Sequence, residues 1–213
     1  MTSSDISKLA PPSFADIQAA AKRIAGAAVR TPLLESQFLN ERVGGRVLVK
    51  AECLQRTGSF KFRGAYNRIS MIPEAERANG VVAYSSGNHA QGVAAAAQAL
   101  GIPTTMLMPA DAPAIKMANT RAYGAEVVTF DRFTDNREEM GEALAREKGA
   151  TIVRPYDDPG IMAGQGTIGI ELAEQAREKG AEVDAVLVCC GGGGLVSGTA
   201  TALASTMPGV PVH

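Results

Sequence analysis

The sequence predicts an α/β fold in which helices cover both faces of a parallel β-sheet. Along most of the chain, short apolar segments of strand length alternate with longer segments of helical periodicity. The segment Val186–Cys190 is apolar at every position, which is typical of a strand buried on both faces. Because open parallel sheets bind ligands at the carboxyl ends of their strands, we expect the functional residues in the loops that follow the strands.

The N-terminal part of the chain begins with a helix. Ser13 and the acidic residue three positions later form a capping pattern, which predicts a helix over residues 13–27. Residues 46–51 are predicted to form a strand. The Thr-Gly-Ser sequence at 57–59 interrupts the pattern, and a helix is predicted over residues 60–71.

From residue 80 onwards, predicted strands and helices alternate regularly, as crossover connections in a parallel sheet require. A loop rich in Pro and Asp is expected at 155–159. The predicted strands cover residues 80–84, 103–108, 126–130, 151–154 and 183–190, and the predicted helices cover residues 89–100, 113–123, 135–148, 161–179 and 195–206.

Composition and charge exclude several classes of protein. The 213 residues carry 21 Lys and Arg against 22 Asp and Glu, for a formal net charge of −1. This balance provides no overall attraction to nucleic acid or to an anionic membrane, so neither partner is expected. The apolar content of 46% is ordinary for a globular domain and argues against disorder. Two histidines, His89 and His213, are too few for a multi-histidine metal centre.

No segment predicts secretion or a membrane span. The residues before Phe14 lack the apolar core of a signal peptide. The longest wholly apolar run, Ala185–Cys190, is far shorter than the ~20 residues that cross a membrane. The three cysteines are too few and wrongly spaced for a disulfide framework. We expect Cys189 and Cys190 to be buried and the protein to be cytoplasmic.

A glycine-rich loop lies between the last predicted strand and the last predicted helix. Gly191–Gly194 allow a sharp turn whose N–H groups point at one position, with the positive end of the helix dipole behind them. Such a loop suits a phosphate group. It matches neither the P-loop, because Thr199 stands where a lysine should follow the last glycine, nor the dinucleotide motif. A tight turn that packs the strand on the helix is the alternative interpretation.

Lys61 is predicted in the first turn of a helix, between Phe60 and Phe62. The helix dipole opposes a positive charge there, and the two aromatic rings would remove water from the amine. Both effects lower the pKa of a lysine, and a neutral amine can add to a carbonyl carbon to form a Schiff base. The alternative is an ordinary solvated lysine.

The sequence Ser85-Ser86-Gly87-Asn88-His89 follows a predicted strand and opens a predicted helix. It offers hydroxyls, an amide and free N–H groups at a positive helix end, which suit a carboxylate or a phenolic oxygen. Helix capping alone is the alternative. Neither serine lies in the G-x-S-x-G pattern of a hydrolase nucleophile, so a serine hydrolase is not expected.

These motifs occur in an order that resembles one enzyme family. Residues 55–65 (QRTGSFKFRGA), 85–91 (SSGNHAQ), 163–167 (AGQGT) and the loop at 191–194 together resemble the serine/threonine dehydratase and serine racemase family. Its members are pyridoxal phosphate enzymes with the tryptophan synthase β-like fold, also called fold type II. The resemblance runs from about residue 14 to the end of the chain. It implies two open parallel-sheet domains, each with a three-layer αβα arrangement.

The resemblance implies roles for residues around bound pyridoxal 5'-phosphate. Lys61 would be the Schiff-base lysine, Phe60 would lie against the cofactor ring, and Asn88 would hydrogen-bond the phenolic oxygen of the ring. The residues that would hold the phosphate are Gly191, Gly192, Gly193, Gly194 and Leu195.

The resemblance also implies a substrate site. Ser85, Ser86 and His89 would line the site of the substrate carboxylate. Ser86 also matches the position that acts as acid and base on the second face of the substrate in racemases, so Lys61 and Ser86 are the expected catalytic residues. Arg137 resembles an arginine that binds the substrate carboxylate, with a solvated helix residue as the alternative.

The implied reaction removes water from a 3-hydroxy amino acid, L-threonine or L-serine, and releases a 2-oxo acid and ammonia. 3-Hydroxyaspartate is the alternative substrate, and its extra carboxylate would need a further cation, for which Arg63, Arg132 and Arg137 are available. Racemisation of serine or aspartate on the same fold is a second alternative. A phosphate-binding module without activity, or an inactive fragment of the family, is the third.

The resemblance further implies domain boundaries, a homodimer and additional ligands. Residues 1–66 and 149–213 would belong to a large domain, and residues 67–148 to a small one. A contact to the pyridine nitrogen and a divalent cation, Mg²⁺ or Ca²⁺, would come from residues beyond 213. Val210–His213 resembles the start of a strand. We therefore expect a chain of roughly two-thirds of the family length that does not fold alone into an active enzyme, because a sheet edge would be exposed.

Overall fold

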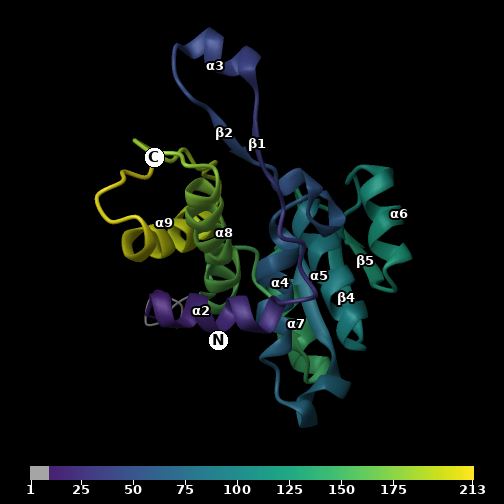
Figure 1. Ribbon diagram of the computed structural model, residues 1–213. Helices are drawn as coiled ribbons and strands as arrows, with labels where there is room; N and C mark the ends of the chain where they lie inside the picture. Colours follow the sequence, from purple (N-terminus) through teal and green to yellow (C-terminus); the bar gives the residue numbers. More distant parts are fainter. Residues whose placement is uncertain (1–9) are drawn as a thin grey trace.

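The computed structural model describes residues 10–213 (Figure 1). The expectation that no signal peptide precedes Phe14 concerns residues that lie mostly outside this range. Within the range, no helix is both long and apolar enough to cross a bilayer. The helices are α2 (Phe14–Ile24), α3 (Gln37–Val43), α4 (Lys61–Ser70), α5 (Asn88–Leu100), α6 (Ala114–Ala122), α7 (Arg137–Lys148), α8 (Pro159–Glu178) and α9 (Gly194–Thr206). The strands are β1 (Leu33–Glu35), β2 (Leu48–Lys50), β3 (Val81–Tyr84), β4 (Thr104–Pro109), β5 (Glu126–Phe130) and β6 (Thr151–Ile152).

Four parallel strands form a sheet with the order β5-β4-β3-β6. β3 lies inside the sheet and pairs with β4 on one side, where Val81 is opposite Thr104, and with the short β6 on the other. β4 pairs in turn with β5. Because all four strands run in the same direction, their carboxyl ends share one edge of the sheet. That edge carries the turn after β3 and the loops after β4 and β5.

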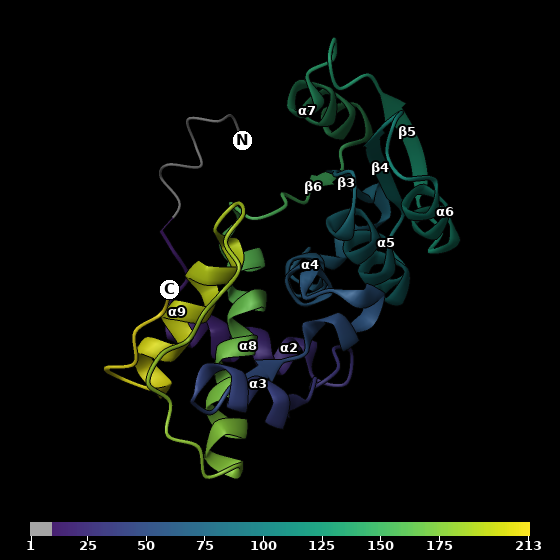
Figure 2. The same cartoon turned by 90° about the horizontal axis from the view of Figure 1, so that it is seen from above.

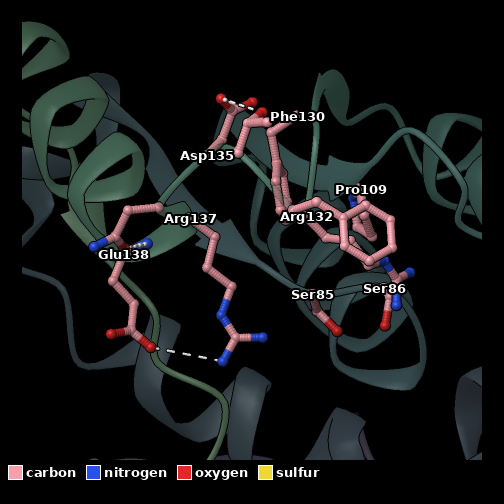
Figure 3. Close-up of a pocket in the computed structure, with 11 residues that line it drawn as sticks. Ser85, Ser86, Pro109, Phe130, Arg132, Asp135, Arg137 and Glu138 are labelled. Carbon is pink, nitrogen blue, oxygen red and sulfur yellow. Dashed lines mark hydrogen bonds and ion pairs between the residues drawn. The ribbon is translucent and has the colours of Figure 1, made fainter.

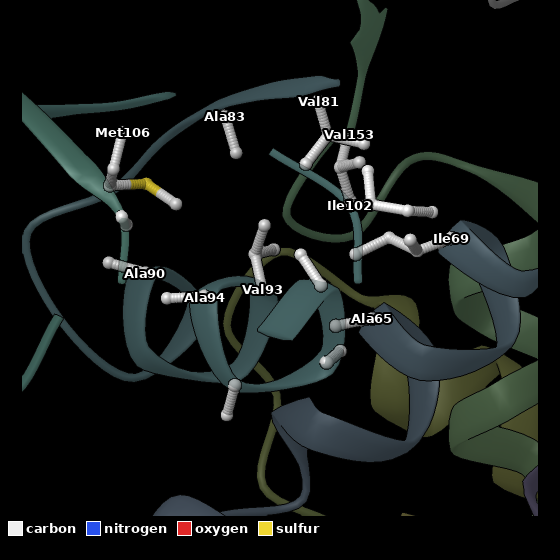
Figure 4. Packing of buried hydrophobic residues seen from close by; sticks show 14 of the residues in the cluster. Ala65, Ile69, Val81, Ala83, Ala90, Val93, Ala94, Ile102, Met106 and Val153 are labelled. Carbon is white, nitrogen blue, oxygen red and sulfur yellow. The ribbon is translucent and has the colours of Figure 1, made fainter. Parts of the chain in front are cut away.

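Helices cover both faces of this sheet and form a three-layer arrangement with it (Figure 2). On one face, Val81, Ala83 and Met106 pack with α4 and α5 in the largest hydrophobic cluster (Figure 4). On the other face, Val82 and Tyr84 pack against α7. Successive residues of a strand point to opposite faces, which explains why β3 is apolar at each of its positions.

The other helices lie beside the sheet-bearing part of the molecule. α8 packs against α4 on one side and α9 on another, and it also contacts α2 (Figure 2). α2 begins with the predicted capping box of Ser13 and Asp16. β1 and β2 pair antiparallel, with Leu33 opposite Lys50, and carry α3 on a protruding arm (Figure 1).

The strand predicted at 183–190 is wrong. Its residues 186–188 pair with 211–213 through three hydrogen bonds, but only an isolated parallel bridge forms, between Val186 and Val212. Val186 packs with residues of α8 and α9, whereas Leu187 is 83% exposed. In the described part of the chain no helix covers the face of this segment that carries Leu187. Cys189 and Cys190 follow the paired residues 186–188, and both are exposed, not buried as predicted.

Most other predicted elements lie within a few residues of the observed ones, and the α/β fold class is confirmed. The first helix ends at Ile24, earlier than predicted, and the strand predicted at 46–51 shortens to β2. β1 and α3 have no counterpart among the predicted elements. The domain boundaries near residues 66 and 148 stay a prediction, and the parallel sheet spans residues 81–152.

Candidate active site

Helix α8 packs closely against two of the helices that carry predicted site residues, α4 and α9. A Cβ atom added to Gly164 would lie 2.6 Å from the Cα atom of Gly64 on α4. One added to Gly166 would lie 2.8 Å from the carbonyl oxygen of Gly198 on α9. Glycine at these positions therefore lets the helix backbones touch. Between the two, Gln165 accepts a hydrogen bond from the N–H of Gly64 at 3.2 Å. The AGQGT sequence thus sets the spacing of α4, α8 and α9.

Lys61 is the first residue of α4, which confirms its predicted place in the first turn of a helix, and its side chain is partly buried. Its Nζ donates a hydrogen bond to the carbonyl oxygen of Pro155 at 2.6 Å and lies 5.2 Å from the centre of the Phe60 ring. Burial lowers the pKa of Lys61. Among residues 10–213, no carboxylate pairs with its amine to oppose this effect. The surroundings therefore favour a neutral amine, which nucleophilic and proton-accepting chemistry requires.

The segment 153–158, which leads from β6 to α8, contacts all three predicted motifs. The carbonyl oxygen of Val153 lies 3.0 Å from Nε2 of His89, at the end of the turn after β3. The carbonyl oxygen of Pro155 accepts from Lys61. The ring of the next residue, Tyr156, lies against the glycine loop. The structure therefore brings the turn after β3, the start of α4 and the glycine loop together along four residues of backbone.

His89 is 3% exposed. Because the carbonyl oxygen of Val153 only accepts, Nε2 of His89 carries the proton and Nδ1 is a bare acceptor. This Nδ1 is buried and has no hydrogen-bond partner among the described residues. Burial lowers the pKa of His89 to about 4, although the Val153 carbonyl opposes the shift. The imidazole is thus neutral near pH 7, and the predicted role of His89 beside a substrate carboxylate stays a prediction.

The turn after β3 is more accessible than His89. Ser86 and Asn88 are exposed, and Ser85 is half-buried, with its hydroxyl accepting a hydrogen bond from the N–H of Gly87 at 3.1 Å. The side-chain oxygen of Asn88 accepts a hydrogen bond from Lys116 of α6 at 2.9 Å. α5 begins at Asn88 with no side-chain cap. Its first N–H groups are therefore available to an anion.

The glycines of the loop at 191–194 are needed for different reasons. Gly193 has a φ of 87°, which residues with side chains rarely adopt. A side chain at Gly192 would clash with the ring of Tyr156, and a Cβ at Gly194 would lie 2.7 Å from its carbonyl oxygen. A Cβ at Gly191 would meet nothing within 4 Å. Turn geometry and packing on Tyr156 thus account for three of the glycines and leave Gly191 open to a ligand.

The start of α9 supplies free hydrogen-bond donors beside this loop. α9 begins at Gly194 without a side-chain cap, whereas α2, α3, α7 and α8 each have one. In the described part of the chain, nothing accepts from the backbone N–H groups of Gly194, Leu195 and Val196. Free N–H groups and the positive end of a helix dipole together suit a phosphate.

A pocket of about 570 Å³ opens at the carboxyl ends of β3, β4 and β5 (Figure 3). Arg137, at the start of α7, lies 5.6 Å from the centre of the Tyr84 ring and 3.6 Å from Glu138. Lys61, Asn88 and the glycine loop do not line this pocket. Lys61 and the glycine loop contact the segment after β6, whereas the pocket lies at the ends of β3, β4 and β5. The lining residues include Ser85, Ser86, Pro109, Phe130, Arg132 and Arg137.

Arg63 lies in a separate cluster and is not available to a substrate. Its side chain is fully buried and donates to the carboxylates of Glu52 and Glu171 at distances of 2.6 to 2.9 Å. Further hydrogen bonds go to the hydroxyl of Thr167 and the carbonyl of Val29. This cluster joins α4 to α8 and to the chain before α4.

Two residues near the site have no signal in the sequence. Tyr156 is an isolated aromatic residue in a predicted loop, and its contact with the glycine loop arises only when α8 and α9 pack together. Lys116 lies on α6, 28 residues after Asn88, and faces the turn only because β3 and β4 are neighbours. A pattern search along the sequence does not reveal contacts of this kind.

Comparison with known proteins agrees with this geometry. Residues 24–213 match a family model described as pyridoxal-phosphate dependent enzyme. The chain belongs to this family. Among curated members, an L-threo-3-hydroxyaspartate ammonia-lyase of a Pseudomonas species is 51% identical, over 92% of this chain and 60% of its own length. Among solved structures of the family, a threonine deaminase of T.th. has 50% identity and a TM-score of 0.88, over 94% of this chain and 64% of its own. Maize serine racemase has 36% identity and a TM-score of 0.91, over 95% of this chain and 60% of its own.

The chain thus spans 60% of the length of the Pseudomonas relative. Membership of the family implies pyridoxal phosphate as the cofactor, and fold type II is confirmed. Within residues 10–213 no group of three or more His, Cys, Asp or Glu is placed to hold a metal ion.

The residues present fit pyridoxal phosphate. The uncapped start of α9 offers N–H donors to a phosphate, and Gly191 leaves room beside them. The amine of Lys61 faces no carboxylate among the described residues, and burial lowers its pKa, which increases the neutral form that adds to an aldehyde. When bound, the cofactor supplies an electron sink for the negative charge that forms at Cα when an amino acid loses a proton.

Proposed function

We propose that this chain carries the active site of an ammonia-lyase that removes water from a 3-hydroxy amino acid and yields a 2-oxo acid and ammonia. One observation carries the proposal: a single backbone segment, 153–158, holds Lys61 through Pro155 and packs Tyr156 on the glycine loop. The distance between amine and phosphate donors is thereby set by the fold. The proposal is supported by relatives named L-threo-3-hydroxyaspartate ammonia-lyase and L-threonine ammonia-lyase.

In this proposal Lys61 performs the proton transfer. As a neutral amine it accepts the proton from Cα of the substrate, and as an ammonium group it can return that proton later. Phe60, whose ring lies beside the amine, excludes water from it. Asn88 binds the phenolic oxygen of the cofactor with its amide, and Lys116 orients that amide. The phosphate is held by the backbone of Gly191 to Gly194 and by Leu195.

The substrate carboxylate binds at the turn after β3. The uncapped N–H groups of α5 and the hydroxyls of Ser85 and Ser86 provide hydrogen bonds to it. Arg137 faces the same pocket and adds a positive charge (Figure 3). His89, neutral and buried, stabilises the turn through the hydrogen bond of its Nε2 to the carbonyl oxygen of Val153.

Amino-acid racemisation is a second candidate. It requires a group that delivers a proton to the face of Cα opposite Lys61. Ser86 is exposed and lines the pocket, so a substrate in the pocket can reach its hydroxyl. A relative named serine racemase, of Schizosaccharomyces pombe, is 44% identical over 95% of this chain. Measuring D-serine formation from L-serine beside ammonia release separates the two activities.

The experiment that tests the proposal is substitution of Lys61. Lys61→Ala should abolish the visible absorbance of lysine-bound cofactor and reduce ammonia release from hydroxy amino acids by at least ~10³-fold. Lys148→Ala, on the exposed end of α7, is the matched control and should retain both properties. Retention of the absorbance by Lys61→Ala would contradict the assignment. A wild-type protein that binds phosphate but shows no visible absorbance would point instead to a phosphate-binding module without activity.

Three further proposals rest on the resemblance alone. The small domain comprises residues 67–148, between two parts of a large domain. The protein forms a homodimer. A divalent cation, Mg²⁺ or Ca²⁺, is bound by residues beyond 213. A fourth proposal, a cytoplasmic location, rests on the three cysteines, which are too few and wrongly spaced for a disulfide framework. Sedimentation of the purified holoenzyme tests the dimer, and activity before and after chelation tests the cation.

A further inference from the structure

The pocket at the carboxyl ends of β3, β4 and β5 contains two arginines, and the proposed chemistry uses only one of them. Arg137 faces the turn after β3 with a weak partner, Glu138 at 3.6 Å. Arg132 follows β5 and lines the same pocket (Figure 3). Its side chain is 45% exposed, and its guanidinium donates to the carboxylate of Asp111, after β4, at 2.7 to 2.8 Å. An arginine that lines the pocket thus already binds a carboxylate, that of Asp111.

The loop that presents Arg132 is held by its own hydrogen bonds. The N–H of Asp131 donates to the carboxylate of Asp135 at 2.8 Å, and the N–H of Asp135 donates to the carbonyl of Asp131 at the same distance. The N–H of Phe133 donates to the Asp131 carboxylate. Arg132 therefore projects from a closed loop whose backbone does not depend on the Arg132–Asp111 pair.

The acidic residues that line the pocket interact with groups other than Arg132. Asp135 accepts from the N–H of Asp131 and from the hydroxyl of Thr134. Glu138 lies beside Arg137. Asp111 alone neutralises Arg132 among the described residues, and its side chain is 58% exposed. Exposed ion pairs contribute little to stability, so Arg132 can exchange Asp111 for another carboxylate at low cost.

We propose that Arg132 selects a substrate with a second carboxylate, a 3-hydroxy amino dicarboxylic acid of the 3-hydroxyaspartate class, and that Asp111 competes with this carboxylate for Arg132. This inference rests on the proposed ammonia-lyase function. The substrate's α-carboxylate binds at the turn after β3, and its distal carboxylate binds the guanidinium of Arg132. Arginine suits this role because its planar group binds a carboxylate through two hydrogen bonds. Arg63 is not available for this role, because its side chain is buried with Glu52 and Glu171.

Two substitutions with opposite expected signs test the proposal. The measured quantity is the ratio of kcat/KM for L-threo-3-hydroxyaspartate to kcat/KM for L-threonine, from ammonia release by the holoenzyme. Arg132→Gln should lower this ratio by about 10- to 100-fold, because a charge-assisted pair is lost. Asp111→Asn should raise it by about 3-fold, because the competing carboxylate is removed. Arg121→Gln, an exposed arginine of α6, should leave the ratio unchanged.

A structural role for the Arg132–Asp111 pair would give a different result, since both substitutions would then reduce turnover of both substrates together. The proposal is overturned if the ratio moves in the same direction in both variants or stays within twofold of wild type. Turnover of threonine without hydroxyaspartate would overturn it and leave the ammonia-lyase function intact.

A binding measurement separates this inference from the proposed function. Succinate carries two carboxylates, and propionate carries one. Succinate should raise the thermal unfolding temperature of the wild-type holoenzyme more than propionate does, and Arg132→Gln should remove the difference. If the wild type releases ammonia from neither substrate but shows this selectivity for succinate, the ammonia-lyase function fails and dicarboxylate recognition by Arg132 stands. Equal effects of both acids on the wild type would contradict it.

Discussion

Lys61 and Arg63 lie two residues apart at the start of α4, and both are withdrawn from water, but their surroundings differ. Arg63 is fully buried and donates to two carboxylates, those of Glu52 and Glu171. Lys61 donates to the carbonyl oxygen of Pro155. Within residues 10–213 it has no acidic partner. One turn of helix therefore places one basic group in an ion cluster and the other against the segment 153–158, which contacts the glycine loop.

The pKa values follow this difference. Burial lowers the pKa of Arg63, but hydrogen bonds with Glu171 and Glu52 outweigh burial and raise it overall. Burial lowers the pKa of Lys61 and no partner opposes it. Acidic partners thus outweigh burial in setting the direction of the pKa shift at Arg63, and burial alone sets it at Lys61. The Arg63 cluster stabilises the fold, whereas the role proposed for Lys61 requires an amine that can lose its proton.

The sharpest test of this comparison replaces each residue by methionine. Arg63→Met leaves Glu52 and Glu171 without their partner and should reduce the free energy of unfolding by about 3 to 5 kcal/mol. Lys61→Met removes a buried amine that has no counter-charge, so stability should be unchanged or higher. Urea unfolding of both variants measures the two effects. Arg30→Met, which breaks an exposed pair with Glu178, is the control and should change stability by less than about 1 kcal/mol.

The comparison would fail if Lys61→Met were as destabilising as Arg63→Met. Lys61 would then be a structural residue like its neighbour. Equal stability of Arg63→Met and wild type would show instead that the ion cluster does not hold α4 against α8.

A smaller effect is expected from His89, which, like Lys61, is buried and pairs with a backbone carbonyl oxygen, that of Val153. Its pKa is about 4 in the folded protein, against about 6.5 in an unfolded chain. The unfolded state therefore binds the proton first as the pH falls. Stability is fully present above pH ~6.5 and declines towards pH ~4, with a total loss of about 3 kcal/mol. Unfolding free energies of wild type and His89→Gln across this range measure the effect. The difference between the two curves should carry this slope, and parallel curves would refute the assignment.

Lys50 provides the smallest and most discriminating test, because it lies between the two cases. It donates to Glu171 at 2.6 Å and to Gln175 at 2.8 Å, yet burial lowers its pKa despite the Glu171 carboxylate. Lys50→Met should cost about 1 to 2 kcal/mol, less than Arg63→Met, because Glu171 still pairs with Arg63. Thermal or urea unfolding decides the order. A loss equal to that of Arg63→Met would mean that the cluster depends on all its members equally.

The strands and helices from β3 to α8 could be predicted from the sequence, because each has an apolar run of strand length or the apolar periodicity of a helix. β3 is apolar on both faces because α4 and α5 cover one face and α7 the other. The segment at 183–190 has the same apolar pattern, but the described chain covers only one of its faces. An apolar sequence pattern predicts which side chains should be buried. Whether they are buried depends on which helices or strands pack against them.

In the candidate site, too, the features that depend on local sequence could be predicted, and the contacts between distant segments could not. Lys61 at the start of a helix and Asn88 at the start of another follow from local sequence. The contact of Tyr156 with Gly192, and that of Asp111 with Arg132, join residues from different loops and depend on the packing of whole elements. The carboxylate partners of Arg63 likewise come from two distant segments, which is why its availability to substrate could not be judged from sequence.

The glycine contacts of α8 have a consequence for how new specificities can arise. Gly164 and Gly166 hold α4, which begins with Lys61, and α9, which follows the glycine loop, against one common helix, α8. The loop at 131–136, which presents Arg132, follows β5 and is closed by its own hydrogen bonds. Mutations in that loop can therefore alter the carboxylate contact proposed for Arg132 without moving the amine of Lys61. If both proposals hold, substrate selectivity can diverge during evolution while the residues proposed for the chemistry stay the same.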